Sequence, residues 1–202
     1  MGLVAVANAD TISFDDAPAG QPPPGWTAGV TGKGSPHWSV EADESAVSAP
    51  HVLKQTGKGT YPWCVLNEVA PADGLVEVRF KPVAGKEDQA AGIVWRFQDA
   101  DNYYVCRANA LENNVVLYKV KKGRRTPLGI VGRKGGYGVR ANVPRGQWST
   151  LRVEFNGPRF AVLLNGERLF EVEDDTFTAA GQIGLWTKAD SVTLFDDFWF
   201  GK

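Results

Sequence analysis

Short alternations of apolar and polar residues, separated by turn residues, run along nearly the whole chain, and no helical periodicity persists for ten residues. Alternation with a period of two is typical of half-buried strands, and many short strands at regular spacing favour a sandwich or barrel over βαβ units. The sequence therefore predicts an all-β fold. The expected strands are residues 11–14, 37–41, 51–55, 64–69, 75–83, 91–97, 103–110, 115–120, 128–131, 148–155, 159–164, 168–172, 182–187 and 191–200.

Turn residues support this fold and indicate a single domain. Asn156-Gly157 and Asn165-Gly166 are hairpin signals, because Asn and Gly tolerate the positive φ angles of a tight turn. The run from Pro22 to Gly25 is too rigid and too poor in donors for a strand, so we expect it to cross the surface. No segment is long or polar enough to be a linker, and residues 10–202 are therefore expected to form one domain.

Charge narrows the choice of partner. The 202-residue chain has a formal net charge of −1, which argues against nucleic acid as the main partner. Between Asn113 and Val153, however, ten residues are basic and none is acidic. Solvated hairpins are the preferred interpretation of this stretch, and a basic rim for an anionic ligand is the alternative. No stretch approaches the length of a membrane helix, so we expect no membrane span.

The N-terminus and the cysteines bear on the compartment. Residues 3–7 form a short apolar run, and Ala7-Asn8-Ala9 matches the small-x-small cut site of a secretory signal. We therefore expect residues 1–9 to be a signal remnant or a cloning tail, and the domain to be secreted or periplasmic. Cys64 and Cys106 fit an oxidising compartment, either as a disulfide or as two buried thiols.

The stretch from Ala91 to Lys119 allows its side chains to be sorted by face. If residues 98–101 form a four-residue turn, Arg96 lies opposite Tyr103 and Gly92 opposite Arg107, and residues two apart share a face. A second turn at residues 112–113 places Tyr118 opposite Arg107. The predicted core face holds Ala91, Ile93, Trp95, Phe97, Tyr104, Cys106, Ala108 and Ala110. The predicted outer face holds Gly92, Arg96, Tyr103, Arg107, Asn109, Val116, Tyr118 and Val120.

This outer face has the composition of a sugar-binding surface. Aromatic rings stack on the apolar side of a pyranose, Arg and Asn offer hydrogen bonds of fixed geometry, and Gly lets a ring approach the sheet closely. In the strand at 182–187, Ile183 and Leu185 are expected inside, which leaves Gly184, Trp186 and Lys188 facing out. The alternative is that amphipathic side chains only cover an exposed sheet. The candidate ligand-binding residues are Arg96, Tyr103, Arg107, Asn109, Glu112, Tyr118, Trp186 and Lys188.

Several short motifs carry a family resemblance. They are Phe14-Asp15-Asp16, Pro24-Gly25-Trp26, Gly92-Ile93-Val94-Trp95-Arg96, Asp101-Asn102-Tyr103-Tyr104, residues 107–114, Gly184-Leu185-Trp186-Thr187-Lys188 and Phe195-Asp196-Asp197-Phe198. Together they resemble secreted bacterial domains of the concanavalin A-like lectin/glucanase superfamily, which includes laminin-G-like jelly rolls and 3-keto-disaccharide hydrolase-type domains. The resemblance implies a two-sheet antiparallel jelly roll with ligands on the concave sheet, and it is weak for activity because the superfamily mixes lectins, binding modules and hydrolases.

Catalytic motifs are sparse. A retaining glycosidase needs two carboxyl groups about 5 Å apart, and Glu171, Glu173 and Asp175 alternate suitably along one strand. They follow a hairpin turn, however, and flank Phe170 and Val172, so a solvated hairpin arm is the preferred interpretation. His37 and His51 lack metal-ligand spacing. Lone acids, such as Glu112 beside Arg107, leave open a hydrolase or lyase acting on a 3-keto sugar, and no catalytic residue is assigned.

The two ends of the chain carry paired acids, Asp15 with Asp16 and Asp196 with Asp197. The first and last strands of a jelly roll often lie side by side, and carboxylates are suitable calcium ligands. The sequence leaves two interpretations open, a structural calcium site formed by these four acids and simple capping of strand ends in solvent. For function, a binding domain for an oligo- or polysaccharide is favoured. A glycoside hydrolase or lyase for modified sugars is second, and a laminin-G-like protein-interaction domain is third. The oligomeric state stays open.

Overall fold

The computed structural model describes residues 10–201, and this part of the chain is built from sixteen strands without a helix. The predicted signal remnant at residues 1–9 lies outside the described residues. Sheet A contains β1 (Asp10–Ile12), β3 (Trp38–Ala42), β4 (His51–Gln55), β6 (Gly74–Ala84), β12 (Ser149–Asn156), β13 (Arg159–Leu164), β14 (Glu167–Glu173) and β16 (Val192–Gly201). Sheet B contains β2 (Trp26–Ser35), β5 (Lys58–Leu66), β7 (Ala90–Asp99), β8 (Asn102–Asn109), β9 (Asn114–Lys121), β10 (Arg124–Pro127), β11 (Val139–Arg140) and β15 (Gln182–Trp186).

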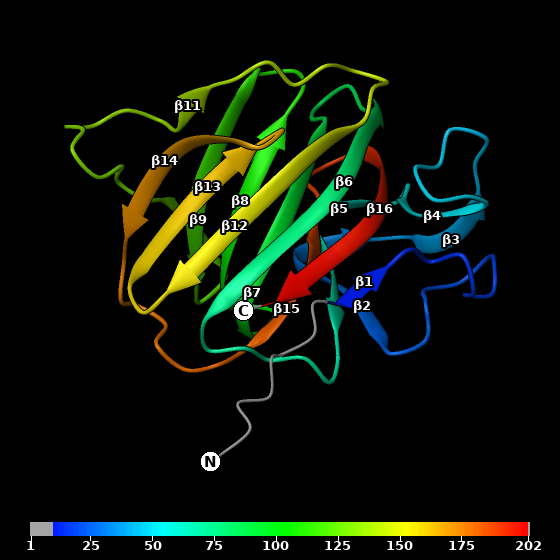
Figure 1. Ribbon diagram of the computed structural model, residues 1–202, viewed down its shortest axis with the longest axis horizontal. Helices are drawn as coiled ribbons and strands as arrows, with labels where there is room; N and C mark the ends of the chain where they lie inside the picture. Colours follow the sequence, from blue (N-terminus) through cyan, green and yellow to red (C-terminus); the bar gives the residue numbers. More distant parts are fainter. Residues whose placement is uncertain (1–9, 202) are drawn as a thin grey trace, which may run out of the picture.

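The two sheets pack face to face as an antiparallel sandwich (Figure 1). Sheet A has the order β14-β13-β12-β6-β16-β4-β3, with β1 on β16, and sheet B has the order β10-β9-β8-β7-β15-β5-β2, with β11 on β9. The pairing of β1 with β16 confirms that the first and last strands lie side by side. The all-β sandwich predicted from the sequence is confirmed. Among the described residues, no helix is long and apolar enough to cross a membrane.

The core between the sheets is rich in aromatic side chains. Trp95 is fully buried and has the rings of Tyr104, Phe155 and Phe160 at centroid distances of 5.4, 6.2 and 5.3 Å. Burying one such side chain contributes about 1.5–3 kcal/mol of stability. Of the predicted core face, Ala91, Ile93, Trp95, Tyr104, Cys106, Ala108 and Ala110 all lie in this cluster. Ile183 and Leu185 lie there too, as predicted.

The hairpin of β7 and β8 departs from the predicted register at its tip. Gly92 pairs with Arg107 and Trp95 with Tyr104 as predicted, but the register shifts before Asp99 pairs with Asn102. The shift is a bulge at Arg96, which has a φ of 46°. A bulge exchanges the faces of the residues beyond it. Phe97 therefore packs on the outer face of sheet B, and its predicted place in the inter-sheet core is wrong.

The next turn is longer than predicted, but the faces are preserved. Asn109 pairs with Asn114 across residues 110–113, so Tyr118 lies opposite Val105 and not opposite Arg107. The side-chain oxygen of Asn109 accepts hydrogen bonds from the backbone N–H groups of Leu111 and Glu112, which builds the longer turn. A change of register by two residues leaves each side chain on its own face.

Two strands of sheet B were misjudged from the sequence. No strand was expected at Trp26–Ser35, because three glycines interrupt its alternation, and yet it is a ten-residue strand. Residues 128–131 were expected to be a strand and contain only an isolated bridge at Ile130, whereas β10 precedes them. The glycines of β2 have a packing role: a Cβ on Gly29 would lie 2.3 Å from the ring of Trp63.

Cys64 and Cys106 are both free thiols buried in the core. Cys64 pairs with Leu185, Leu185 with Ile93, and Ile93 with Cys106, so the two cysteines lie in one row, three strand spacings apart. That is about 14 Å along a sheet, and a disulfide requires Cα atoms within about 7 Å. The disulfide alternative is therefore wrong.

Candidate functional site

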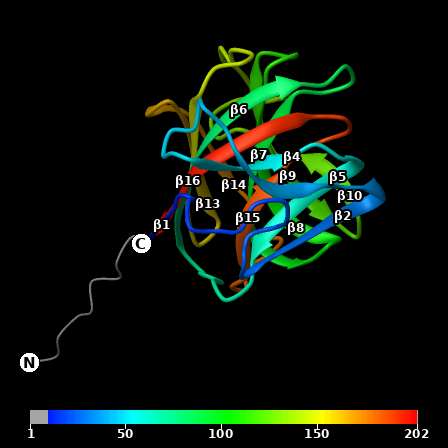
Figure 2. The same cartoon turned by 90° about the vertical axis from the view of Figure 1, so that its right-hand side faces the viewer.

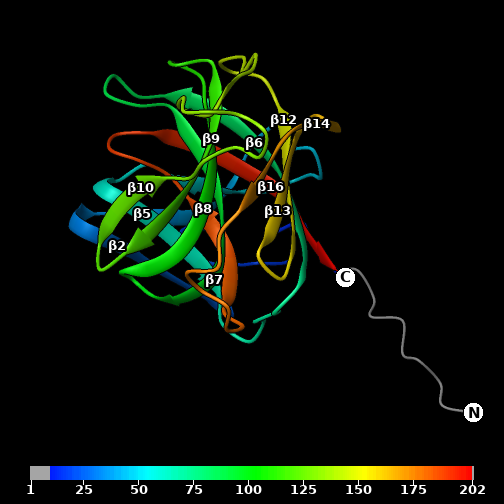
Figure 3. The same ribbon diagram turned by 90° about the vertical axis from the view of Figure 1, so that its left-hand side faces the viewer.

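The outer face of sheet B, the one turned away from sheet A, is curled, and its apolar side chains are buried against one another. This curled face is called the trough below. The hydroxyl groups of Thr31 on β2 and Tyr103 on β8 lie 2.8 Å apart, although three strands separate β2 from β8. In a flat sheet these strands would be about 19 Å apart. Figures 2 and 3 show β2, β5 and β10 on the side of the molecule away from sheet A. The guanidinium carbon of Arg125 on β10 lies 4.9 Å from the ring centroid of Tyr61 on β5, although four strands separate β10 from β5 in the sheet order.

The floor of the trough is a second apolar cluster. Its members are Trp63, Val65, Ala90, Val94, Phe97, Tyr103, Val105, Val116, Tyr118, Val120 and Trp186, with Tyr61 packed against them. Gly92 gives the floor its depth, because a Cβ there would lie 3.2 Å from the ring of Trp186. This is the close approach of a ring to the sheet that the sequence indicated.

One end of the trough is polar and centred on Arg107. The guanidinium group is 1% exposed, and its Nη2 donates to Glu112 Oε2 at 2.8 Å and to the hydroxyl groups of Tyr118 and Tyr137 at 3.1 Å. Its Nη1 donates to the side-chain oxygen of Asn114. Burial opposes the charge on Arg107, but Tyr118 and Glu112 outweigh it and raise the arginine pKa. Arg107 is thus a fixed cation in the sheet and not a free surface group.

A second charged pair adjoins Arg107. Asp88 is 1% exposed and accepts hydrogen bonds from Asn109 and from Nζ of Lys188, both at 2.5 Å. The backbone N–H of Asp88 donates to the carboxylate of Asp190, which also binds the N–H groups of Lys86 and Glu87. The loop before β7 is therefore anchored, and Asp88 is held in place beside Asn109.

The mouth of the polar end is lined by partly exposed groups. Tyr137 is 46% exposed, and the side chains of Glu112 and Lys188 are 39% and 30% exposed. Burial works to raise the pKa of Glu112, but Arg107 and Asn114 lower it overall, so this carboxyl is ionised at neutral pH. A hydroxyl-bearing ligand at the mouth would meet a ring, a carboxylate and an ammonium group.

Arg125 on β10 covers the middle of the floor. Its guanidinium carbon lies 4.3 Å from the ring centroid of Tyr118, 4.9 Å from that of Tyr61 and 5.7 Å from that of Trp186. Cation–π contacts of this kind are individually worth about 0.5–2 kcal/mol. Arg125 reaches the floor because it pairs with Val120 across the turn at Lys122-Gly123.

Most of the predicted ligand-binding residues come together in the trough. Tyr103, Tyr118 and Trp186 form part of its floor, Arg107 and Asn109 lie at its polar end, and Glu112 and Lys188 bind these side chains or their partner Asp88. Tyr103 is fully buried, and burial raises the pKa of its hydroxyl to about 12. Whether these groups hold a ligand stays a prediction.

Arg96 does not belong to the trough, which corrects its place on the predicted outer face. Its guanidinium group is 2% exposed and donates to the carbonyl oxygens of Ala72, Phe177 and Gly157 at one end of the sandwich. The bulge at Arg96 turns the side chain away from the trough and toward three carbonyl oxygens that accept its hydrogen bonds.

Sequence reasoning missed Tyr61, Trp63, Asp88, Arg125 and Tyr137. Strand parity could have identified Arg125. A two-residue turn at Lys122-Gly123 places it opposite Val120, on the face already assigned to Tyr118. Tyr137 lies in an irregular loop, and no periodicity indicates its position.

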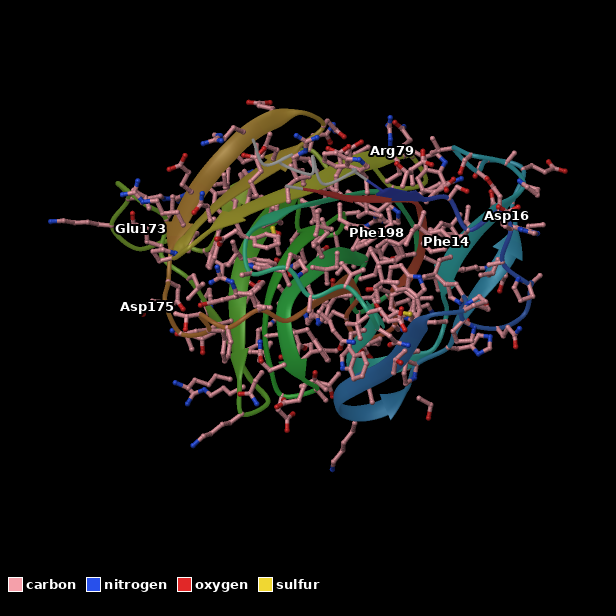
Figure 4. The ribbon with its side chains drawn as sticks, turned by 60° about the horizontal axis from the view of Figure 1, so that its bottom comes forward. Phe14, Asp16, Arg79, Glu173, Asp175 and Phe198 are labelled. Atoms are coloured by element: carbon pink, nitrogen blue, oxygen red, sulfur yellow. The ribbon has the colours of Figure 1, made fainter. Side chains whose placement is uncertain are left out.

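The acidic row at the end of β14 is a hairpin arm, as the sequence favoured. Phe170 and Val172 face the core, Glu171 pairs with Arg168, and Glu173 pairs with Arg159 at 2.8 Å. Figure 4 shows Glu173 and Asp175 at the edge of the molecule, far from Asp16 on the opposite side.

The paired aspartates hold loops in the structure. The buried carboxylate of Asp196 accepts hydrogen bonds from the N–H groups of Val47, Ser48 and Asp197 and from the Ser48 hydroxyl, and that of Asp15 accepts one from the N–H of His51. Phe14 points inward beside Phe198, whereas Asp16 lies out on the following loop (Figure 4). Within residues 10–201, no group of three or more His, Cys, Asp or Glu side chains is placed to hold a metal ion. The calcium ion stays a prediction.

A hollow of about 750 Å³ lies on sheet A, and its lining includes Ala72–Leu75, Glu154 and Arg168. Its charged groups neutralise each other, because Arg168 pairs with both Glu154 and Glu171. The trough instead gathers seven of the eight predicted ligand-binding residues, so we place the candidate site there.

One known family matches nearly the whole of the described chain. The family described as 3-keto-alpha-glucoside-1,2-lyase-like domain matches residues 13–201. The chain belongs to this family. No curated protein matches the sequence.

Among solved structures, the family member is similar to carbohydrate-binding module CBM66 from Bacillus subtilis. The TM-score is 0.67 at 19% identity, over 86% of this chain and 93% of the other. A β-glucanase from Bacillus licheniformis gives a TM-score of 0.59 at 11% identity, over 98% and 99% of the two chains. A protein of unknown function with a galectin-like fold, from Bacillus subtilis, gives 0.60 at 14% identity, over 87% and 88%. At such identities these similarities establish the fold alone.

Proposed function

We propose that this family member is a carbohydrate-binding domain that holds a glycan at the polar end of the trough. The observation that carries the proposal is the buried Arg107–Asn109–Asp88 cluster, with Tyr137, Glu112 and Lys188 exposed at its mouth. Hydrogen-bonding groups held rigidly by buried partners bind at a low entropic cost. A half-exposed tyrosine ring provides a surface on which a pyranose can stack.

The experiment is a glycan-array screen followed by calorimetry with the glycan that binds. Glu112→Gln and Tyr137→Ala should each weaken binding about tenfold or more, since each removes one contact worth roughly 1.4 kcal/mol. Glu173→Gln is the matched control, because Glu173 is an exposed, arginine-paired acid on sheet A. Equal affinities for Glu112→Gln and Glu173→Gln would place the ligand elsewhere.

A second function is favoured by the family match and by the groups that surround the guanidinium group of Arg107. Elimination across C1 and C2 of a 3-keto glycoside needs a base at the acidic C2 hydrogen and a donor for the departing oxygen. In the polar end, the Glu112 carboxylate and the hydroxyl groups of Tyr118 and Tyr137 all contact the guanidinium group of Arg107. These groups supply an ionised acid and two hydroxyl donors around one cation.

This second function is tested with methyl 3-keto-α-glucoside. Release of methanol should follow enzyme concentration, and Glu112→Gln should reduce the rate by 10²-fold or more, the usual contribution of a general base. A rate that Glu112→Gln leaves unchanged would assign the chain to binding alone.

A further inference from the structure

The trough contains one cation that no acid balances. Arg107 pairs with Glu112 and Lys188 with Asp88, at 2.8 and 2.5 Å. Arg125 makes neither an ion pair nor a hydrogen bond with any of the residues 10–201, and its Nη1 is buried without an acceptor. Arg125 is partly exposed, so its charge is open to a ligand from solvent, and no acid among the described residues neutralises it.

Other donors at the same place also lack acceptors. Nε of Arg107 and Nε1 of Trp63 are buried and unpartnered, and both residues lie in the trough. The guanidinium carbons of Arg107 and Arg125 both lie within 6 Å of the Tyr118 ring centroid, at 5.9 and 4.3 Å. Each of the two guanidinium groups beside this ring therefore has one buried nitrogen without an acceptor, Nε in Arg107 and Nη1 in Arg125.

The segment of sequence that contains Arg125 is also positively charged. Arg125 belongs to the stretch from Asn113 to Val153, which has ten basic and no acidic residues. Arg133 of that stretch lies in the loop that carries Tyr137, where its Nη1 donates to the carbonyl oxygen of Gly138. Arg125 and Arg133 thus add positive charge near the trough, and positive charge raises the local concentration of anions.

We infer that the glycan carries a carboxylate, as a uronic acid residue does, and that Arg125 is the counter-charge of this carboxylate. The inference rests on the proposed function and specifies its ligand. A carboxylate accepts two parallel hydrogen bonds from a guanidinium edge, a geometry that neutral hydroxyl groups do not match. It also balances the charge that the protein leaves open at Arg125.

The test is calorimetry at low salt with oligogalacturonate and with a glucuronate disaccharide, each compared with its methyl ester. The ester keeps the sugar and removes only the charge. The wild type should bind each acid at least about tenfold more tightly than its ester. Arg125→Gln should abolish this preference. Arg124→Gln, which removes the neighbouring exposed arginine on the opposite face of β10, should keep it.

Arg125→Lys separates charge from geometry, because it should retain part of the preference while losing the planar fork. Melting curves of the variants confirm that they are folded. Equal binding of acid and ester by the wild type, or a preference that survives in Arg125→Gln, overturns the inference. Neutral glycans that bind without preference for acids would leave the proposed function intact, whereas the absence of any glycan binding would overturn both.

Discussion

The hydroxyl groups of Thr31 on β2 and Tyr103 on β8 lie 2.8 Å from each other, although three other strands separate β2 from β8 in sheet B. The Tyr103 hydroxyl also accepts a hydrogen bond of 3.4 Å from the indole of Trp186. This buried link holds the curl of the trough, because no backbone pairing connects β2 with β8.

Tyr103→Phe should therefore lower the free energy of unfolding by about 1–2 kcal/mol, the usual cost of losing a buried hydrogen bond. Urea titration measures the loss, and Thr31→Val should produce a similar one. The double variant should lose less unfolding free energy than the sum of the two single variants, since both changes break the same Thr31–Tyr103 hydrogen bond. Strictly additive losses would show that the two hydroxyl groups act independently.

Arg107→Ala should destabilise the protein as well as weaken ligand binding. From the sequence we would expect little effect on folding, but the side chain is 1% exposed and binds Glu112, Asn114, Tyr118 and Tyr137. Removing one partner of a fully buried ion pair costs roughly 3–5 kcal/mol, and the cost here should be smaller because Glu112 is 39% exposed. Arg107→Lys, which keeps the charge, should lose less. An unchanged urea midpoint for Arg107→Ala would contradict the buried position.

Gly29→Ala should destabilise the floor of the trough. A Cβ at this position would lie 2.3 Å from the ring of Trp63, so one of the two must move. Overpacking of this kind costs about 1–3 kcal/mol. Trp63→Leu in the same chain should recover part of the loss, whereas Gly157→Ala, at a turn with open space around its Cα, tests backbone strain without a clash. A Gly29→Ala variant as stable as the wild type would refute the close contact.

Stability at acid pH should depend on Asp174. Burial opposes ionisation, but hydrogen bonds from Lys119, Thr176 and Tyr104 lower the pKa of this carboxyl from 3.8 to about 2. Because the folded pKa is the lower one, the stabilisation is complete above about pH 4 and is lost as the pH falls toward 2. The shift corresponds to about 2 kcal/mol.

Asp174→Asn should accordingly be less stable than the wild type at pH 6 and approach it at pH 2. Urea midpoints between pH 6 and pH 2 measure this difference. Asp175→Asn is the control, since it changes the neighbouring acid. A constant gap between Asp174→Asn and the wild type at every pH would exclude the titration of this carboxyl as its cause.

Variants of Asp196 and Asp197 distinguish a loop-anchoring role of these carboxylates from a metal-binding role. Asp196→Ala should lower the melting temperature in every buffer, because its carboxylate binds Val47 and Ser48 directly. If calcium also binds there, EDTA should lower the melting temperature of the wild type and leave Asp197→Ala unaffected. Identical wild-type curves with and without EDTA would exclude the metal.

Arg107 and Arg96 show which side-chain positions could be predicted from the sequence and which could not. Strand parity placed Arg107 and Cys106 on opposite faces correctly, because a pleated strand leaves its side chains only two directions. The same argument failed at Arg96, where three distant carbonyls of Ala72, Phe177 and Gly157 draw the side chain into a bulge. Those acceptors come from other parts of the chain, and a local pattern holds no information about them.

The curl of sheet B could not be predicted from sequence patterns either. Periodicity assigned Tyr103 and Trp186 to one face, but it did not indicate that both would be fully buried. Their burial requires β2 and β10 to approach across the sheet, and β2 was hidden by its glycines. Sequence patterns therefore predicted which residues share a surface better than they predicted the shape of that surface.

Cys64 and Cys106 provide the domain with two internal reporters of its own opening. Burial raises the pKa of each thiol, so neither forms a thiolate while the sandwich is closed. A thiol reagent can then label them only when the sheets separate, and the labelling rate in dilute denaturant becomes a measure of the opening free energy. With one cysteine on each side of β7 and β15, comparing the two rates would tell whether sheet B comes apart as one unit or strand by strand.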